Sequence, residues 1–189
     1  IQEDISYHGN PDQIKQLGTA QSAALETSQI KSLTAAQLSA MGTDQIAAIE
    51  TADLAQLSAA QLKGLTTDQI KGLSTTQVEK LSATQIKALS TAQVAAIETA
   101  DLAKFSTEQI AALSAAQVKG MSTDQIKALS TDQVKGLQDA QIKALSTDQI
   151  KQLGTAQIGA LETNQIKSLT AAQLGSMGTD QIAAIETTD

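Results

Sequence analysis

Residues with reactive or ligating side chains recur along this chain at intervals of eight, so their spacing determines what chemistry they could perform. Serine and threonine hydroxyls act as nucleophiles only when a general base lies beside them. The one imidazole is His8, next to Tyr7 in the start IQEDISYHGN, and the chain has no second histidine and no cysteine. A lone histidine of this kind is a weak acid–base or metal site. We therefore expect no catalytic residue, no metal site, no cofactor and no enzymatic activity.

A column of aspartates could suggest calcium, which needs six to eight oxygens around one point. These aspartates are spaced at multiples of eight residues: Asp12, Asp44, Asp68, Asp124, Asp132, Asp148 and Asp180. Several have a lysine three residues on, which favours pairing along a helix surface; these are Lys15, Lys71, Lys127, Lys135 and Lys151. We interpret the column as exposed charge that complements helix dipoles.

Threonines form a second regular column, which includes Thr67, Thr75, Thr91, Thr123, Thr131 and Thr147. They fall at the predicted first position of each helix, where exposure to solvent is expected. A regular row of hydroxyls could bind ice or a polysaccharide. We therefore keep a surface binding array as a second hypothesis beside a purely structural role.

Composition limits the class of partner. The formal net charge is −7, all basic charge is on lysine, and Tyr7 and Phe105 are the only aromatic residues. A nucleic-acid partner is not expected, because the chain has neither a basic patch nor aromatic platforms for stacking on bases. No apolar run approaches the roughly 18 residues that cross a bilayer, so we expect no membrane span.

The period of eight residues runs without a gap or insertion. Stepping by eight from Gln13, every position to Asp189 is glutamine except Asp53, Asp101 and Asp189. An aliphatic residue follows almost every member of this column, and a second large apolar residue lies four positions after it. Successive large apolar residues are thus three and then five positions apart. This alternation fits neither one amphipathic helix nor a strand with a single apolar face. The chain must therefore change direction within every octad.

Each octad carries the signals of a helix start. In LSTDQV, residues 129–134, Ser130 fits the N-cap and Gln133 can bond back to the cap backbone, which is a capping box. Leu129 and Val134 flank the cap as a hydrophobic staple. The predicted cap pairs here are Ser122 with Gln125 and Ser130 with Gln133. The predicted core residues are Ile126, Leu129, Val134 and Leu137.

The single proline supports the same register. Asn10 falls in the cap column and Pro11 in the first helical column, where the missing N–H of proline costs nothing. Each octad is thus predicted to form a helix of about six residues, well below the roughly 12 to 15 at which isolated helices become marginally stable. Stacking on neighbouring repeats of the same chain must stabilise it. We predict an all-α solenoid of very short capped helices, one per octad.

A longer duplication lies over the octads. Residues 12–53 match residues 148–189 except at six positions: Ser22/Ile158, Ala23/Gly159, Ser28/Asn164, Ser39/Gly175, Ala40/Ser176 and Ala52/Thr188. We therefore expect residues 10–189 to form one continuous solenoid that belongs to a longer array. Residues 1–9 are predicted to be a separate, non-repetitive segment.

The pattern L-[ST]-x-x-Q-[IV]-x-x, as in LSTAQVAA at residues 89–96, resembles the octapeptide tandem repeats of very large secreted or surface-attached bacterial proteins described as adhesin-like. The resemblance implies an extracellular or cell-surface location and a non-enzymatic spacer, stalk or surface-layer element. Two alternatives stay open. One is a solenoid that binds a protein or glycan at the cell surface, and the other is self-association into filaments through the solenoid ends.

Overall fold

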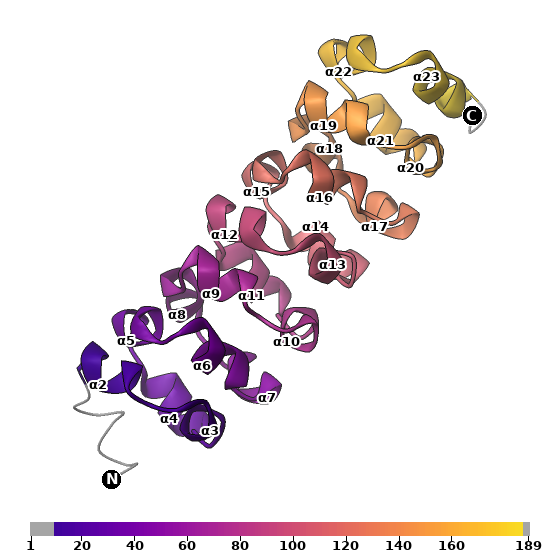
Figure 1. Cartoon of the computed structure of the whole chain (residues 1–189). Helices are drawn as coiled ribbons and strands as arrows, with labels where there is room; N and C mark the ends of the chain where they lie inside the picture. Colours follow the sequence, from indigo (N-terminus) through magenta and orange to yellow (C-terminus); the bar gives the residue numbers. More distant parts are fainter. Residues whose placement is uncertain (1–9, 187–189) are drawn as a thin grey trace. The chain divides into compact units, whose positions relative to one another are not determined.

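The computed structural model describes residues 10–186, all of whose regular structure is α-helix. The chain divides into two compact units, Ile1–Ile97 and Glu98–Asp189, and each is described by itself. In both units, short helices follow one another about every eight residues (Figure 1). The prediction of an all-α solenoid of very short helices is confirmed. The predicted segment 1–9, with His8, lies outside the described residues.

The helices of the first unit are four to six residues long. They are α2 (Pro11–Lys15), α3 (Thr19–Ala23), α4 (Thr27–Ser32), α5 (Ala35–Ala40), α6 (Thr43–Ala48), α7 (Thr51–Leu54), α8 (Ala59–Gly64), α9 (Thr67–Lys71), α10 (Thr75–Glu79), α11 (Ala83–Ala88) and α12 (Thr91–Ala96).

The second unit repeats this arrangement. Its helices are α13 (Thr99–Leu102), α14 (Thr107–Ala112), α15 (Ala115–Gly120), α16 (Thr123–Lys127), α17 (Thr131–Gly136), α18 (Asp139–Ala144), α19 (Thr147–Gln152), α20 (Thr155–Gly159), α21 (Thr163–Ser168), α22 (Ala171–Ser176) and α23 (Thr179–Glu186). Within the described residues no helix is long and apolar enough to cross a membrane.

In most octads the helix starts at a reciprocal cap. In α17, the Ser130 hydroxyl accepts from the Gln133 N–H at 3.1 Å, and Oε1 of Gln133 accepts from the Ser130 N–H at 2.9 Å. Ser122 and Gln125 make the same two bonds at 3.1 and 2.9 Å. At the start of α2, Asn10 and Gln13 exchange bonds of 3.0 and 3.1 Å around Pro11 at the first helical position.

Most helices end just before the second apolar residue of the octad, whose backbone is extended. Leu137, which follows α17, has φ −67° and ψ 134°, so the chain leaves the helix axis and enters the next cap. No described residue has a positive φ. The turn therefore needs no left-handed glycine, and its sharpness comes from an ordinary extended residue placed between two helices.

The two apolar columns form the core of each unit. Ile126 and Val134 are fully buried, and Leu129 and Leu137 are each 4% exposed. Ser22 is the one hydroxyl in the first apolar column; it is buried, and its hydroxyl donates to the Gly18 carbonyl at 3.1 Å. Its counterpart in the duplicated segment, Ile158, is fully buried hydrocarbon.

Helices pack on the third helix along the chain, so α5 lies on α2 and α8 lies on α5 (Figure 1). Small residues permit this approach. A Cβ added to Gly64 in α8 would lie 2.5 Å from the Cβ of Ala35 in α5, closer than carbon atoms approach. In the second unit, a Cβ added to Gly136 in α17 would lie 3.0 Å from the Cβ of Thr107 in α14. The stacking distance is thus set by the last turn of one helix and the first residue of another.

Candidate functional site

Glutamine side chains are the most regular polar groups in the interior. From Gln37 onward, nearly every described glutamine of the column is at most 8% exposed. In α12, Oε1 of Gln93 accepts from the Ser90 N–H at 2.8 Å, which caps its own helix. Nε2 of the same side chain donates to the carbonyls of Leu62 and Leu65, both at 2.8 Å. One amide therefore holds the start of one helix and the end of another.

This arrangement, which we call the glutamine clamp, keeps one offset in both units. Its Nε2 reaches the carbonyls 31 and 28 residues earlier, at the end of the helix four octads back. In the second unit, Gln141 of α18 donates to Ile110 at 2.8 Å and to Leu113 at 2.6 Å. Helix stacking joins octads three apart and the clamp joins octads four apart, so one turn of the stack takes between three and four octads.

The clamp supplies partners for backbone groups that a short helix leaves over. The last carbonyls of a helix lack intrahelical donors, and so short a helix consists almost wholly of ends. A hydrogen bond contributes about 0.5–1.5 kcal/mol net, whereas a buried polar group without a partner costs about 1–3 kcal/mol. Among the described residues, no buried side-chain nitrogen or oxygen lacks a hydrogen-bond partner. The buried polar side chains of these residues are therefore all hydrogen-bonded.

The exchange of glutamine for Asp53 alters the clamp in α7. Asp53 is 7% exposed, and its carboxylate accepts a hydrogen bond from the hydroxyl of Thr27, the first residue of α4. A carboxylate has no N–H, so Asp53 has nothing to donate to the carbonyls of Ser22 and Leu25, which stand at the usual offset of the clamp. The side chain of Glu50 at the N-cap of α7 makes no cap bond. The hydroxyl–carboxylate bond joins this octad to α4 instead, while the carbonyls of Leu54 and Leu57 at the end of α7 still accept from Nε2 of Gln85 at 3.2 and 3.0 Å.

The structure places the predicted threonines at the first position of their helices. Thr67, Thr75, Thr91, Thr131 and Thr147 are exposed and Thr123 is half-buried. Threonines three octads apart lie on stacked helices: Thr67 with Thr91 on α9 and α12, and Thr123 with Thr147 on α16 and α19. The six do not form one row, since Thr75 lies on α10 and Thr131 on α17.

The exposed aspartates and lysines are mostly too far apart to pair. Of the five predicted pairs, only Asp148 with Lys151 comes within 4 Å, at 3.9 Å, among the residues that the structure describes. These two side chains are 81% and 54% exposed, so the pair adds little stability. Over residues 10–186, no three histidine, cysteine, aspartate or glutamate side chains converge on a point that could hold a metal ion.

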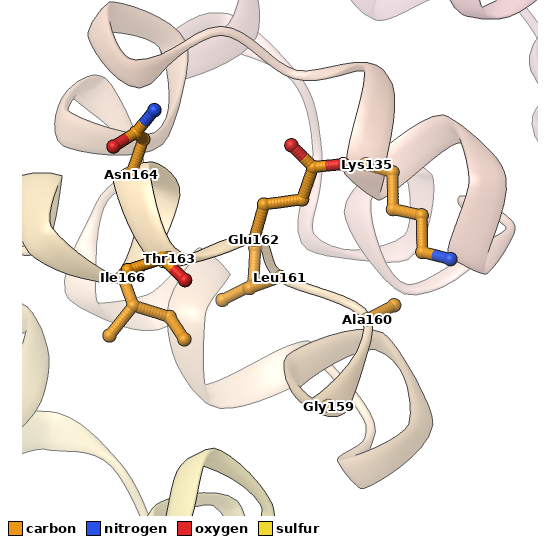
Figure 2. Close-up of a pocket in the computed structure, with 8 residues that line it drawn as sticks. All are labelled: Lys135, Gly159, Ala160, Leu161, Glu162, Thr163, Asn164 and Ile166. Atoms are coloured by element: carbon orange, nitrogen blue, oxygen red, sulfur yellow. The ribbon is translucent and has the colours of Figure 1, made fainter. Parts of the chain in front are cut away.

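Two hollows open on the surface of the second unit. One, of about 540 Å³, is lined by the Lys135 and Glu162 side chains, with Gly159 beside them (Figure 2). The other, of about 510 Å³, is lined by Lys119, Lys143 and Ser146 at the equivalent positions two octads earlier. The same place in the repeat thus carries one lysine and one glutamate in the first hollow and two lysines in the second.

Short capped helices that recur every eight residues, a core of two apolar columns and clamps at a constant offset define this chain as an α-solenoid built from tandem repeats. The model of the ALTTAQ repeat family matches residues 46–83, 94–131, 126–155 and 150–187, which together exceed half of the chain. The chain belongs to the ALTTAQ repeat family. No curated protein matches it.

The role of the glutamine amide nitrogen was missed by sequence reasoning, which assigned these residues to capping alone. One signal could have revealed it. A capping box accepts glutamate as readily as glutamine, yet glutamate never occurs in this column. Only glutamine has both the acceptor that the cap needs and a donor for something else.

Proposed function

We propose that this chain is a non-enzymatic, extended spacer in an extracellular or surface-attached bacterial protein. The observation that supports this most directly is the constant offset of the glutamine clamp, 31 and 28 residues, in both units. Octads that carry the clamp meet equivalent neighbours through the same bonds. Adding octads therefore adds length and leaves the existing contacts unchanged, as in other repeat arrays stabilised by nearest neighbours.

The location rests on the likeness of the octad, L-[ST]-x-x-Q-[IV]-x-x, to the repeats of secreted and surface-attached bacterial proteins. Protease treatment of intact producing cells tests it. We expect the chain to be cleaved before the cells lyse. Protection of the chain until lysis would contradict a surface location.

The duplication offers a direct test of the spacer. Because residues 46–53 match residues 182–189 apart from Ala52/Thr188, a second copy of residues 54–189 can follow Asp189 in register. Solution X-ray scattering would compare the original and lengthened chains. We expect the maximum dimension to increase in proportion to the added octads at a constant cross-section, and the melting midpoint to rise.

A closed or tightly curled array gives a different result. Its maximum dimension would hardly increase while its cross-section grew, which would exclude the spacer. A melting midpoint independent of array length would exclude nearest-neighbour stabilisation.

A further inference from the structure

Lysines of the second unit are unevenly distributed over its stacked helices. Helices α15, α18 and α21 pack on one another in turn, and each carries a lysine at the same position of its octad. These are Lys119, Lys143 and Lys167, spaced three octads apart. We call this set the lysine file. It places three cations on successive layers of one stack.

Acidic residues that accompany lysines elsewhere in this unit are missing from the equivalent position of the lysine file. On α16 and α19, the second helical position is Asp124 or Asp148, three residues before the lysine. On the lysine file, the same position is Ala116, Ala140 or Asn164. Among the described residues, the ammonium groups of Lys119 and Lys143 have no carboxylate within 4 Å. Asp139, the first residue of α18, lies four residues before Lys143 on the same helix, and its carboxylate too is more than 4 Å from the ammonium group. Lys119 and Lys143 therefore form no ion pair with a described residue, on a chain whose net charge is −7.

The hollow of about 510 Å³ lies along this file. Lys119 and Lys143 both line it, together with the hydroxyl-bearing residues Thr147 and Thr170 and the methyl groups of alanines from α15 and α18. No acidic residue lines it. Cations, hydroxyls and small apolar groups thus meet on one shallow, open surface.

The equivalent hollow two octads later lacks this combination of side chains. There Gly159 replaces Lys143, and Glu162 replaces Ser146 (Figure 2). One lysine and one carboxylate leave no net positive charge. The two hollows have the same backbone register, so they form a natural pair that differs in the charge and size of the lining.

We propose that the hollow at Lys119 and Lys143 binds an acidic sugar unit of an anionic glycan. The two ammonium groups attract the carboxylate of the sugar, the threonine hydroxyls exchange hydrogen bonds with its hydroxyls, and the alanine methyls pack on its C–H face. A glycan suits this surface better than an acidic peptide, because the hollow contains no deep apolar pocket for a side-chain anchor. This binding goes beyond the spacer role and does not depend on it.

Titration of the full chain with hexagalacturonate, followed by amide chemical shifts, tests the site. We expect shifts around Lys119, Lys143 and Thr147, and a double Lys119→Gln, Lys143→Gln variant that binds at least about tenfold more weakly, equivalent to about 1.4 kcal/mol. The matched control is Lys127→Gln with Lys151→Gln, which removes the same charge from the neighbouring stack. We expect it to change affinity less than about twofold, because exposed charges at a distance are screened by salt.

A third variant, Ser146→Glu, installs the carboxylate that the hollow of Figure 2 carries. It should weaken binding, but less than the loss of both lysines, because both ammonium groups remain. Glutamate already occupies the N-cap of α21, so this variant retains an octad that folds. Absence of hexagalacturonate binding, or equal losses in the test and control pairs, would overturn the proposal. Equal binding of hexaglutamate with the same dependence on Lys119 and Lys143 would overturn its glycan specificity.

Discussion

Helices α7 and α12 of the first unit occupy equivalent places in their octads but are joined to the rest of the stack by different chemistry. In α12, Gln93 uses one amide to cap its own helix and to bind the carbonyls of Leu62 and Leu65. In α7, Asp53 accepts from the Thr27 hydroxyl instead. Helix α12 has six residues and helix α7 has four.

The repeat normally gives one glutamine side chain two tasks, which are to cap its own helix and to bind the end of another. Asp53 performs neither of them. Asp53 connects to the start of a helix three octads back, whereas Gln93 connects to the end of a helix four octads back. The octad of α7 keeps the stacking of the apolar columns, in which Leu54 and Val94 are both fully buried, and it keeps the clamp from Gln85 onto the end of α7. The apolar columns thus hold the helices together, and the polar side chain selects the helix end to which its own helix is joined.

Replacing Gln93 with glutamate should have the largest effect on this comparison. Glutamate retains the acceptor for the Ser90 N–H, but it turns a second oxygen toward the carbonyls of Leu62 and Leu65. We expect the free energy of unfolding to fall by about 2–4 kcal/mol, because the Leu65 carbonyl loses this donor and a charge is buried beside both carbonyls. The Leu62 carbonyl keeps a second donor, the backbone N–H of Leu65 at 3.1 Å. Denaturant unfolding and hydrogen exchange of the α12 amides would measure the loss.

A matched control for this substitution is Gln13→Glu. Gln13 caps Asn10 in the same way but is exposed, so the change should stay within about 0.5 kcal/mol. Equal stability of both variants would mean that glutamine in this column acts only as a cap.

Removing the Thr27 hydroxyl tests the bond that replaces the clamp. Thr27→Val keeps the shape of the side chain and removes the donor to Asp53. We expect a loss of about 1.5–3 kcal/mol in the free energy of unfolding, as for hydrogen bonds to charged groups. A double-mutant cycle with Asp53→Gln provides the control, because Thr27→Val should become nearly neutral once the carboxylate is gone. A loss of the same size in both backgrounds would show that Thr27 acts independently of Asp53.

Changes at the N-caps should have the smallest effect and sharpen the contrast between the two octads. Ser90→Ala removes the acceptor for the Gln93 N–H, 3.1 Å away, and should cost about 1 kcal/mol. Glu50→Ala should leave the free energy of unfolding nearly unchanged, because the Glu50 side chain makes no cap bond. Thermal unfolding of the two variants side by side would measure this, and a comparable cost for both would contradict the cap geometry of α7.

Local structure could be predicted from the sequence because its signals lie within one octad. Ser130, Gln133 and the flanking apolar residues are close together along the chain, and they specify the cap, the helix and the buried face. The stacking distance could not be predicted in this way. Every octad resembles every other, with no consistent alternation over two or three octads, so nothing indicates whether the second, third or fourth neighbour is the partner.

The same limit explains why the clamp and the Asp53 bond were missed. The partners of Gln93 lie 31 and 28 residues away, and Thr27 lies 26 residues from Asp53. Those separations follow from the number of octads in a turn of the stack, which is a property of the packed array.

The constant offset of the clamp has a consequence for the gene. The partners of every clamping glutamine lie at a fixed number of residues before it. Insertion or deletion of whole octads therefore leaves each remaining glutamine opposite an equivalent helix end. Unequal recombination between near-identical stretches, such as those encoding residues 12–53 and 148–189, preserves this register. Any insertion that is not a multiple of the octad destroys it locally. Folding therefore permits arrays of different lengths, provided that they differ by whole octads.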